Sequence, residues 1–328
     1  MAGNSTFSRI QTRARRIDPN FARQLAPFVV LIALVIIVGL ATPEFLKLHS
    51  LIVLASDTAT LFVLGAGATF VIMLGSIDLS IEAVASFVSV IVALTLPDLG
   101  YLAFVLGVVV GFGVGVINGI VHVRLLLPSF IVTLAAAGVW TGVGLLISDA
   151  TSVPIDADDR HLTSWITGTV LGIPNELLIA GVVLVVGLFL QHYIQFGRYS
   201  KAIGSGEAAT WASGVKVRIT KITAFAIAGA LAGMTGVMLA GRLSSGGPRI
   251  ADQFLLPAIA TVVVGGTSVS GGVGSIWRTF IGAMIVSVIR TGMNFVGVDV
   301  FSQQIVFGAV LILAVGVTID RSKMPIIK

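Results

Sequence analysis

Residues 24–43 read QLAPFVVLIALVIIVGLATP and contain no charged side chain, although Arg23 and Glu44 border them. A helix of this length spans ~30 Å, which is the thickness of the hydrocarbon layer of a membrane. The stretch therefore predicts a transmembrane helix. A basic segment precedes it, as in a signal peptide, but no small-residue cleavage pattern follows, so we expect this helix to be retained.

Further apolar runs continue to the end of the chain. They lie near residues 51–74, 80–96, 101–123, 128–148, 177–195, 221–241, 254–266, 276–296 and 302–319. The run that ends near Gly265 is short, and its continuation is too rich in glycine for an uninterrupted helix. We predict an all-α, polytopic membrane bundle of about ten transmembrane helices, with broken or re-entrant segments.

The composition supports this class. The 328 residues are 56% hydrophobic and 11% charged, whereas roughly 25% of a soluble domain is charged. A soluble globular enzyme is therefore excluded. The chain has no cysteine and no phosphate loop, nucleophile elbow or H-E-x-x-H pair. We expect no catalytic residue, no metal and no cofactor, which argues against a membrane-embedded protease or hydrolase.

The basic residues indicate the orientation. With the N-terminus inside, fifteen of the 20 Lys and Arg residues fall in inner segments, as expected because short cytoplasmic loops retain positive charge. We expect a cytoplasmic basic segment at 1–24, a membrane domain at 25–319 and a cytoplasmic tail at 320–328. Since the net charge of +5 is explained by orientation, we expect no nucleic acid as a partner.

Glycines repeat every four residues in two of the runs. Gly107, Gly111, Gly115 and Gly119 share one helix face, and so do the residues at 229 and 233. Such stripes allow helices to approach closely in membranes. They predict a compact bundle and carry no chemistry.

Polar breaks interrupt the apolar pattern twice. The first reads GSIDLS and contains Asp78 and Ser80, and the second reads GGTSVSGG and contains Thr267, Ser268 and Ser270. Unwound backbone is tolerated in a membrane where it lines a cavity, so these five residues are candidates for a substrate pathway. The alternative is that both breaks are tight cytoplasmic turns.

One cytoplasmic segment, residues 198–214, favours a docking role. Glu207 to Ser213 predicts a short Ala-rich helix that presents small residues and a tryptophan to a partner, although an ordinary surface loop is the alternative. The candidate docking residues are Gly204, Glu207, Ala208, Ala209, Trp211 and Gly214.

Three stretches resemble the permease subunits of ribose-type bacterial ABC importers. GSIDLS at 75–80 is similar to the family's GGIDLS, and residues 115–119 with PSFIVTL at 128–134 are similar to its N-G and P-x-F-I-x-T-L motifs. The third stretch comprises the docking segment, LPAIA at 256–260 and GGTSVSGGVGS at 265–275. The chain departs from the family at Ser76, Ile81-Glu82, Gly206, Thr210 and Trp211, which affects the details of substrate and partner.

The resemblance implies an importer of a neutral sugar in the bacterial inner membrane. Two permease copies or paralogues would form the pathway, two cytoplasmic ATPases would dock at residues 198–214, and an external sugar-binding protein would deliver the substrate. It adds Asn118, Phe130 and Thr133 to the pathway candidates. The external loop at 241–253 carries Arg242 and Arg249, which would anchor the binding protein or would remain solvated loop charges.

Other substrates and one other class remain open. Related permeases carry nucleosides, autoinducer-like furanoses or branched-chain amino acids. An ion-coupled secondary transporter is the alternative class, but the sequence shows no chain of intramembrane acids for it.

Overall fold

The computed structural model describes residues 19–318, with side chains described for residues 27–316. Most of the basic segment expected at 1–24, and the tail expected at 320–328, lie outside these residues. The described chain is a bundle of α-helices with four two-residue strands. The predicted all-α class is therefore correct for the described residues except for these strands.

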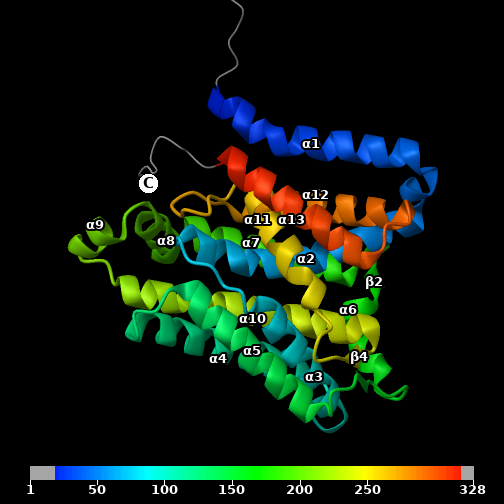
Figure 1. The fold of residues 1–328 in the computed structure, drawn as a ribbon. Coiled ribbons are helices and arrows are strands. Elements are labelled where there is room, and N and C mark those ends of the chain that lie inside the picture. The colour runs from blue at the N-terminus through cyan, green and yellow to red at the C-terminus, as the bar shows by residue number, and fades with distance from the viewer. Residues whose placement is uncertain (1–18, 319–328) are drawn as a thin grey trace, which may run out of the picture.

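The helices follow one another with short connections (Figure 1). The longer ones are α1 (Pro19–Ala41), α2 (Leu48–Met73), α3 (Ile81–Leu99), α4 (Leu102–Arg124), α5 (Ser129–Ile147), α7 (Asn175–His192), α10 (Val217–Leu243), α12 (Ile276–Phe295) and α13 (Val300–Thr318). The shorter ones are α6 (Ser164–Thr167), α8 (Gln195–Ser205), α9 (Glu207–Ala212) and α11 (Leu255–Val264), with 3-10 turns at Pro43–Leu46, Arg160–Thr163 and Asp252–Phe254.

Each of the ten expected apolar runs coincides with a helix. Seven of these helices (α2, α3, α4, α5, α7, α10 and α12) are long and apolar enough to cross a membrane. In the other three, α1, α11 and the last helix, the apolar stretch is shorter, at Pro27–Ala41, Asp252–Val264 and Val300–Gly316. The structure thus agrees with a multi-pass helical membrane protein.

The bundle has two distinct ends (Figure 1). Helices α8 and α9 lie at one end, which we call the α9 end, and the strand β4 (Ser245–Gly246) lies at the opposite, β4 end. β4 pairs with β1 (Val153–Pro154), and β2 (Thr169–Val170) pairs with β3 (Ile173–Pro174), both antiparallel. Both ends of the described chain lie at the α9 end, so the described helices return to the side from which they start.

Two sets of four helices, α2 to α5 and α10 to α13, pack in a reciprocal pattern. Helix α10 lies against α4 as α2 lies against α12, and α3 contacts α10 as α11 contacts α2. Within the sets, α3 packs on α4 and α5, and α11 packs on α12 and α13. Since α2 runs toward the α9 end and α10 runs away from it, this is the pattern of an inverted internal repeat.

The glycine stripes bring the two sets together. A methyl group added at Gly111 of α4 would collide with the carbonyl oxygen of Gly229 in α10, and one added at Gly229 would collide with that of Gly111. At Gly115 the obstacle is the carbonyl oxygen of Phe225. The prediction that these glycines allow close helix approach is confirmed, and their partners are one another.

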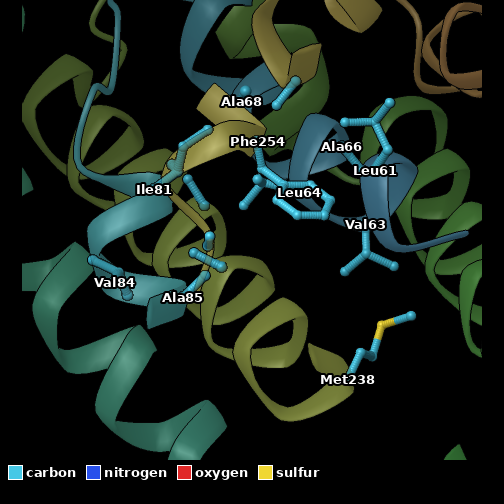
Figure 2. Packing of buried hydrophobic residues seen from close by; sticks show 14 of the residues in the cluster. Leu61, Val63, Leu64, Ala66, Ala68, Ile81, Val84, Ala85, Met238 and Phe254 are labelled. Atoms are coloured by element: carbon cyan, nitrogen blue, oxygen red, sulfur yellow. The ribbon is translucent and has the colours of Figure 1, made fainter. Parts of the chain in front are cut away.

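The core lies where α2 crosses α3 and α10. Figure 2 shows Leu64 of α2, Ile81 and Val84 of α3 and Met238 of α10 around one region, with Phe254 from the turn before α11. Because the surrounding lipid is itself apolar, such packing stabilises the bundle through close van der Waals contact.

Candidate functional site

The first polar break is a non-helical segment at residues 74–80, between α2 and α3. Its backbone is hydrogen-bonded to the side chains of α5. The amide of Ile77 donates to Ser129 Oγ over 3.0 Å, and the amide of Leu79 donates to Thr133 Oγ1 over 3.0 Å. Hydroxyl groups of a neighbouring helix thus replace the missing helical hydrogen bonds, as a membrane interior requires.

The side chains of this break form a buried network with α4. Asp78 Oδ1 accepts from the amide of Ser80 (2.9 Å) and from its hydroxyl (2.6 Å). Asn118 Nδ2 in turn donates to Ser80 Oγ over 2.9 Å. All three side chains are buried, and so is Thr133. Four of the predicted pathway residues therefore lie together, but as a network that holds the break in place.

Phe130 does not join this network. It lies in the first turn of α5, three residues before Thr133, and its side chain is 50% exposed. The phenyl group contacts no polar side chain of the break. Because it is exposed on α5, it can contact lipid or another chain.

A second break occurs at residues 244–254, between α10 and α11, and the sequence reasoning did not identify it. The amide of Gly247 donates to Ser89 Oγ over 3.1 Å, and the amide of Ala251 donates to Ser86 Oγ over 3.0 Å. Both serines lie on α3 and are buried. The available signals were the sequence SSGGP at 244–248 and two serines one turn apart in an apolar helix.

The predicted break at 265–272 is a connection at the α9 end between α11 and α12. Thr267 is buried, Ser270 is exposed, and the amide of Ser268 donates to the carbonyl of Val273. These three residues do not reach the Asp78 network. Their loop instead meets the end of α2, where the amide of Gly272 donates to the carbonyl of Met73 over 2.9 Å.

The predicted docking segment forms the two helices α8 and α9. Gly204 near the end of α8 packs so closely that a methyl group there would collide with the carbonyl of Met73 and the amide of Gly272. Lys221 of α10 binds both carboxylate oxygens of Glu207, over 2.8 and 2.7 Å. The segment is therefore attached to α2, to the 265–275 loop and to α10.

The remaining candidate docking residues of this segment are exposed. Trp211 is 70% exposed, and Ala208, Ala209 and Gly214 are exposed as well. Gly214 has a positive φ of 82°, which favours glycine. The predicted short helix between glycines is confirmed, and its free surface is at one end of the bundle.

The two arginines of the 241–253 loop differ. Arg242 Nη1 lies 2.6 Å from Asp57 Oδ1 of α2, so its charge is paired within the chain. Arg249 is exposed and interacts electrostatically with Asp252. Of these two arginines, Arg249 is the exposed one, and Arg242 is only partly exposed.

Residues 27–316 contain no group of three or more potential metal ligands among His, Cys, Asp and Glu. The side chains that converge in the two breaks are hydroxyl and amide groups of serine, threonine and asparagine, together with the carboxyl group of Asp78; in addition, Glu82 in the first turn of α3 interacts electrostatically with Asp252 of the second break. Such groups hydrogen-bond to one another, to backbone and to polar solutes.

Residues 50–315 match the family described as "Branched-chain amino acid transport system / permease component". The chain is 36% identical to the ribose import permease protein of Bacillus subtilis (strain 168), over 96% of this chain and 98% of the relative. It is 31% identical to the ribose import permease protein of Escherichia coli (strain K12), over 90% and 92%. It is also 31% identical to the D-allose transport system permease protein of that strain, over 96% and 98%.

No solved structure matches the chain. The family match nevertheless covers both breaks, the docking segment and the helices that carry them. On that match, and on the similarity over nearly the full length of these relatives, the chain belongs to the family of transport-system permease components.

Proposed function

We propose that this chain is the permease subunit of an ATP-driven ABC importer that carries a neutral sugar across the bacterial plasma membrane. The relatives named above are a ribose import permease and a D-allose transport permease, which supports a pentose-like or hexose-like substrate. In this proposal the chain crosses the membrane ten times, through the seven long helices and the three shorter ones. Both termini and the α9 end face the cytoplasm.

The observation that carries the proposal is the attachment of the exposed α9 to the helix before the first break. Gly204 abuts the end of α2, and the 74–80 segment follows directly. A cytoplasmic ATPase that binds Ala208, Ala209 and Trp211 would act on the backbone beside Asp78. ATP hydrolysis belongs to that partner, and differential binding to two conformations of the permease drives transport.

The proposed assembly has two permeases, two ATPases and one external binding protein. Helix α5 is largely exposed, since only 17% of the residues in its apolar stretch are buried. A second copy or a paralogue of the chain covers part of this surface, lipid covers the remainder, and the substrate passes along the two breaks. Asp78, Ser80, Asn118 and Thr133 hold the first break, and the loop with Thr267, Ser268 and Ser270 lies at its cytoplasmic exit.

Three other readings compete with this one. The family description names branched-chain amino acids, and nucleosides or autoinducer-like furanoses are further candidates in the same class. An ion-coupled carrier is the alternative mechanism. The hydroxyl and amide groups of the breaks suit a hydroxyl-rich neutral solute, and the ribose and D-allose permeases among the relatives support a sugar over an amino acid.

The test is uptake into vesicles that contain this chain, its co-encoded ATPase and its binding protein. We expect labelled ribose or allose to enter only when ATP is present, and uptake to survive collapse of the proton gradient. Uptake of leucine in place of the sugars would assign the amino-acid branch. Uptake that stops with the proton gradient and ignores ATP would assign the ion-coupled carrier.

A further inference from the structure

The β4 half of the bundle contains four charged side chains that neither break uses. Asp57 of α2 is paired with Arg242 of α10. Glu176 of α7 and Arg290 of α12 interact electrostatically with both of them. The group contains two acids and two bases from four helices, so it is neutral as a whole.

Glu176 is the unusual member of this group. Its side chain is only 4% exposed, and although its carboxyl group interacts with the hydroxyl of Ser56, its Oε1 has no hydrogen-bond partner among the described residues. A buried carboxylate oxygen without a hydrogen-bond donor destabilises the conformation in which it occurs. The cation that interacts electrostatically with Glu176 is Arg242, which carries five N–H donors and uses its Nη1 for Asp57, so it has donors left for a second carboxylate.

Arg290 makes an exchange of partners inexpensive. If Arg242 leaves Asp57, the electrostatic interaction between Arg290 and Asp57 still compensates part of the charge of Asp57. The guanidinium of Arg290 also lies 4.8 Å from the ring centre of Phe254, a cation–π contact. Phe254 ends the second break and precedes α11, so the charged group is connected to that break on one side and to α2 on the other.

We propose that Glu176 is the second acceptor of Arg242 in the transport cycle. As the end of α10 moves relative to α2, Arg242 passes from Asp57 to Glu176, and the residues that follow it at 244–254 move with it. Glu176 is thus a positioning residue that stabilises a conformation other than the one described here. The inference rests on the proposed function, because it needs an ATP-driven change between two states.

The first experiment compares Glu176→Gln with the wild-type chain in the vesicle assay described above. The variant removes the negative charge and keeps the shape. We expect ATP-driven uptake to fall about tenfold, as for the loss of a charge-assisted hydrogen bond, while the thermal stability of the nucleotide-free complex stays equal or rises. Asp156→Asn, which changes an exposed acid two residues after β1, the strand that pairs with β4, is the matched control and should transport normally.

The second experiment measures the coupling of Arg242 to each acid by double-mutant cycles. Arg242→Gln, Asp57→Asn and Glu176→Gln are combined in pairs, and thermal unfolding is followed in the nucleotide-free and the vanadate-trapped complex. We expect Arg242 to couple mainly to Asp57 in one state and mainly to Glu176 in the other. The same coupling to Asp57 in both states overturns the proposal.

Two further outcomes also decide. If Glu176→Gln takes up substrate at the wild-type rate, Glu176 does not act in the cycle. If the variant loses uptake and its nucleotide-free complex is also destabilised, Glu176 only stabilises the resting structure. Either result overturns the inference alone. Failure of the wild-type chain to transport with its ATPase refutes the proposed function instead.

Discussion

Asn118 of α4 donates a hydrogen bond from Nδ2 to Oγ of Ser80, the residue that immediately precedes α3. The contact spans 38 positions of the sequence and adds a polar link between α4 and the start of α3. Because Ser80 Oγ donates onward to Asp78, the amide of Asn118 orients the whole first break. The break is therefore held by α4 from one side and by α5 from the other.

Replacing Asn118 with Ala should loosen the first break. The variant deletes one buried hydrogen bond and leaves a small void, so we expect a loss of roughly 1–3 kcal/mol in the free energy of unfolding. Thermal unfolding of the purified chain in detergent measures this loss. Ser270→Ala is the control, since its side chain is exposed and at the far loop, and an equal loss there would argue against a special role for the network.

The sequence was sufficient to locate the helices but only one of the two breaks. A window of apolar residues depends on composition alone, so each expected run coincides with a helix. The 244–254 segment is held by Ser86 and Ser89, which lie more than 150 positions earlier. The sequence SSGGP at 244–248 signals a turn but not that the amides of the segment have partners, and a hydropathy pattern cannot distinguish the segment from an ordinary external loop.

The sequence also could not decide between pathway and turn for the polar breaks, because that depends on burial. At 74–80 the polar groups point inward and are paired, whereas at 265–272 the backbone turns at the end of the bundle and Ser270 is exposed. The glycine stripes were more informative, because a spacing of four residues fixes a face of a helix whatever its partner is. The second stripe, at 229 and 233, is also visible in the sequence, and the structure shows that the two stripes pack against each other.

Ser86→Ala and Ser89→Ala should each destabilise the second break. Each change leaves a buried backbone amide, of Ala251 or Gly247, without its acceptor, which costs about 1–3 kcal/mol. We expect increased hydrogen exchange of the 244–254 amides as well as a lower unfolding temperature. Thr95→Val on the same helix is the control, because the hydroxyl of Thr95 bonds only to the carbonyl of Ile91 one turn earlier; a comparable effect there would contradict the assignment.

Gly111→Ala should separate α4 from α10. The added methyl group meets the backbone of Gly229 and Gly233, which cannot yield as a side chain can, so we expect a destabilisation of roughly 1–3 kcal/mol. Gly113→Ala on the same helix has nothing within 4 Å of the new methyl group and should be neutral or slightly stabilising, by up to ~1 kcal/mol. Equal unfolding temperatures for the two variants would contradict the packing argument.

Arg249→Glu should weaken the binding of the external protein. An exposed charge at the rim of an interface contributes modestly, so we expect the dissociation constant to rise about threefold to tenfold, and less at high salt. Titration of the binding protein onto the permease in nanodiscs measures this. Arg242→Glu is not an equivalent test, because it places a second acid against Asp57; an unchanged affinity for Arg249→Glu at low salt would eliminate Arg249 as an anchor.

Ala209→Arg should uncouple the proposed ATPase from the permease. Ala209 is exposed on α9 beside Trp211, so a long charged side chain there leaves the fold intact but obstructs a partner that packs on small residues. We expect substrate-stimulated ATP hydrolysis to be lost while membrane insertion and unfolding temperature stay unchanged.

Gly214 is a less suitable site, because its φ of 82° strains any other residue and would mix a folding defect with a docking defect. Ala157→Arg places the same charge on the exposed loop that follows β1, the strand that pairs with β4, and should keep full stimulation. Both variants add the same charge at an exposed alanine, so retained stimulation in Ala209→Arg would mean that α9 is an ordinary exposed helix and that the ATPase docks elsewhere.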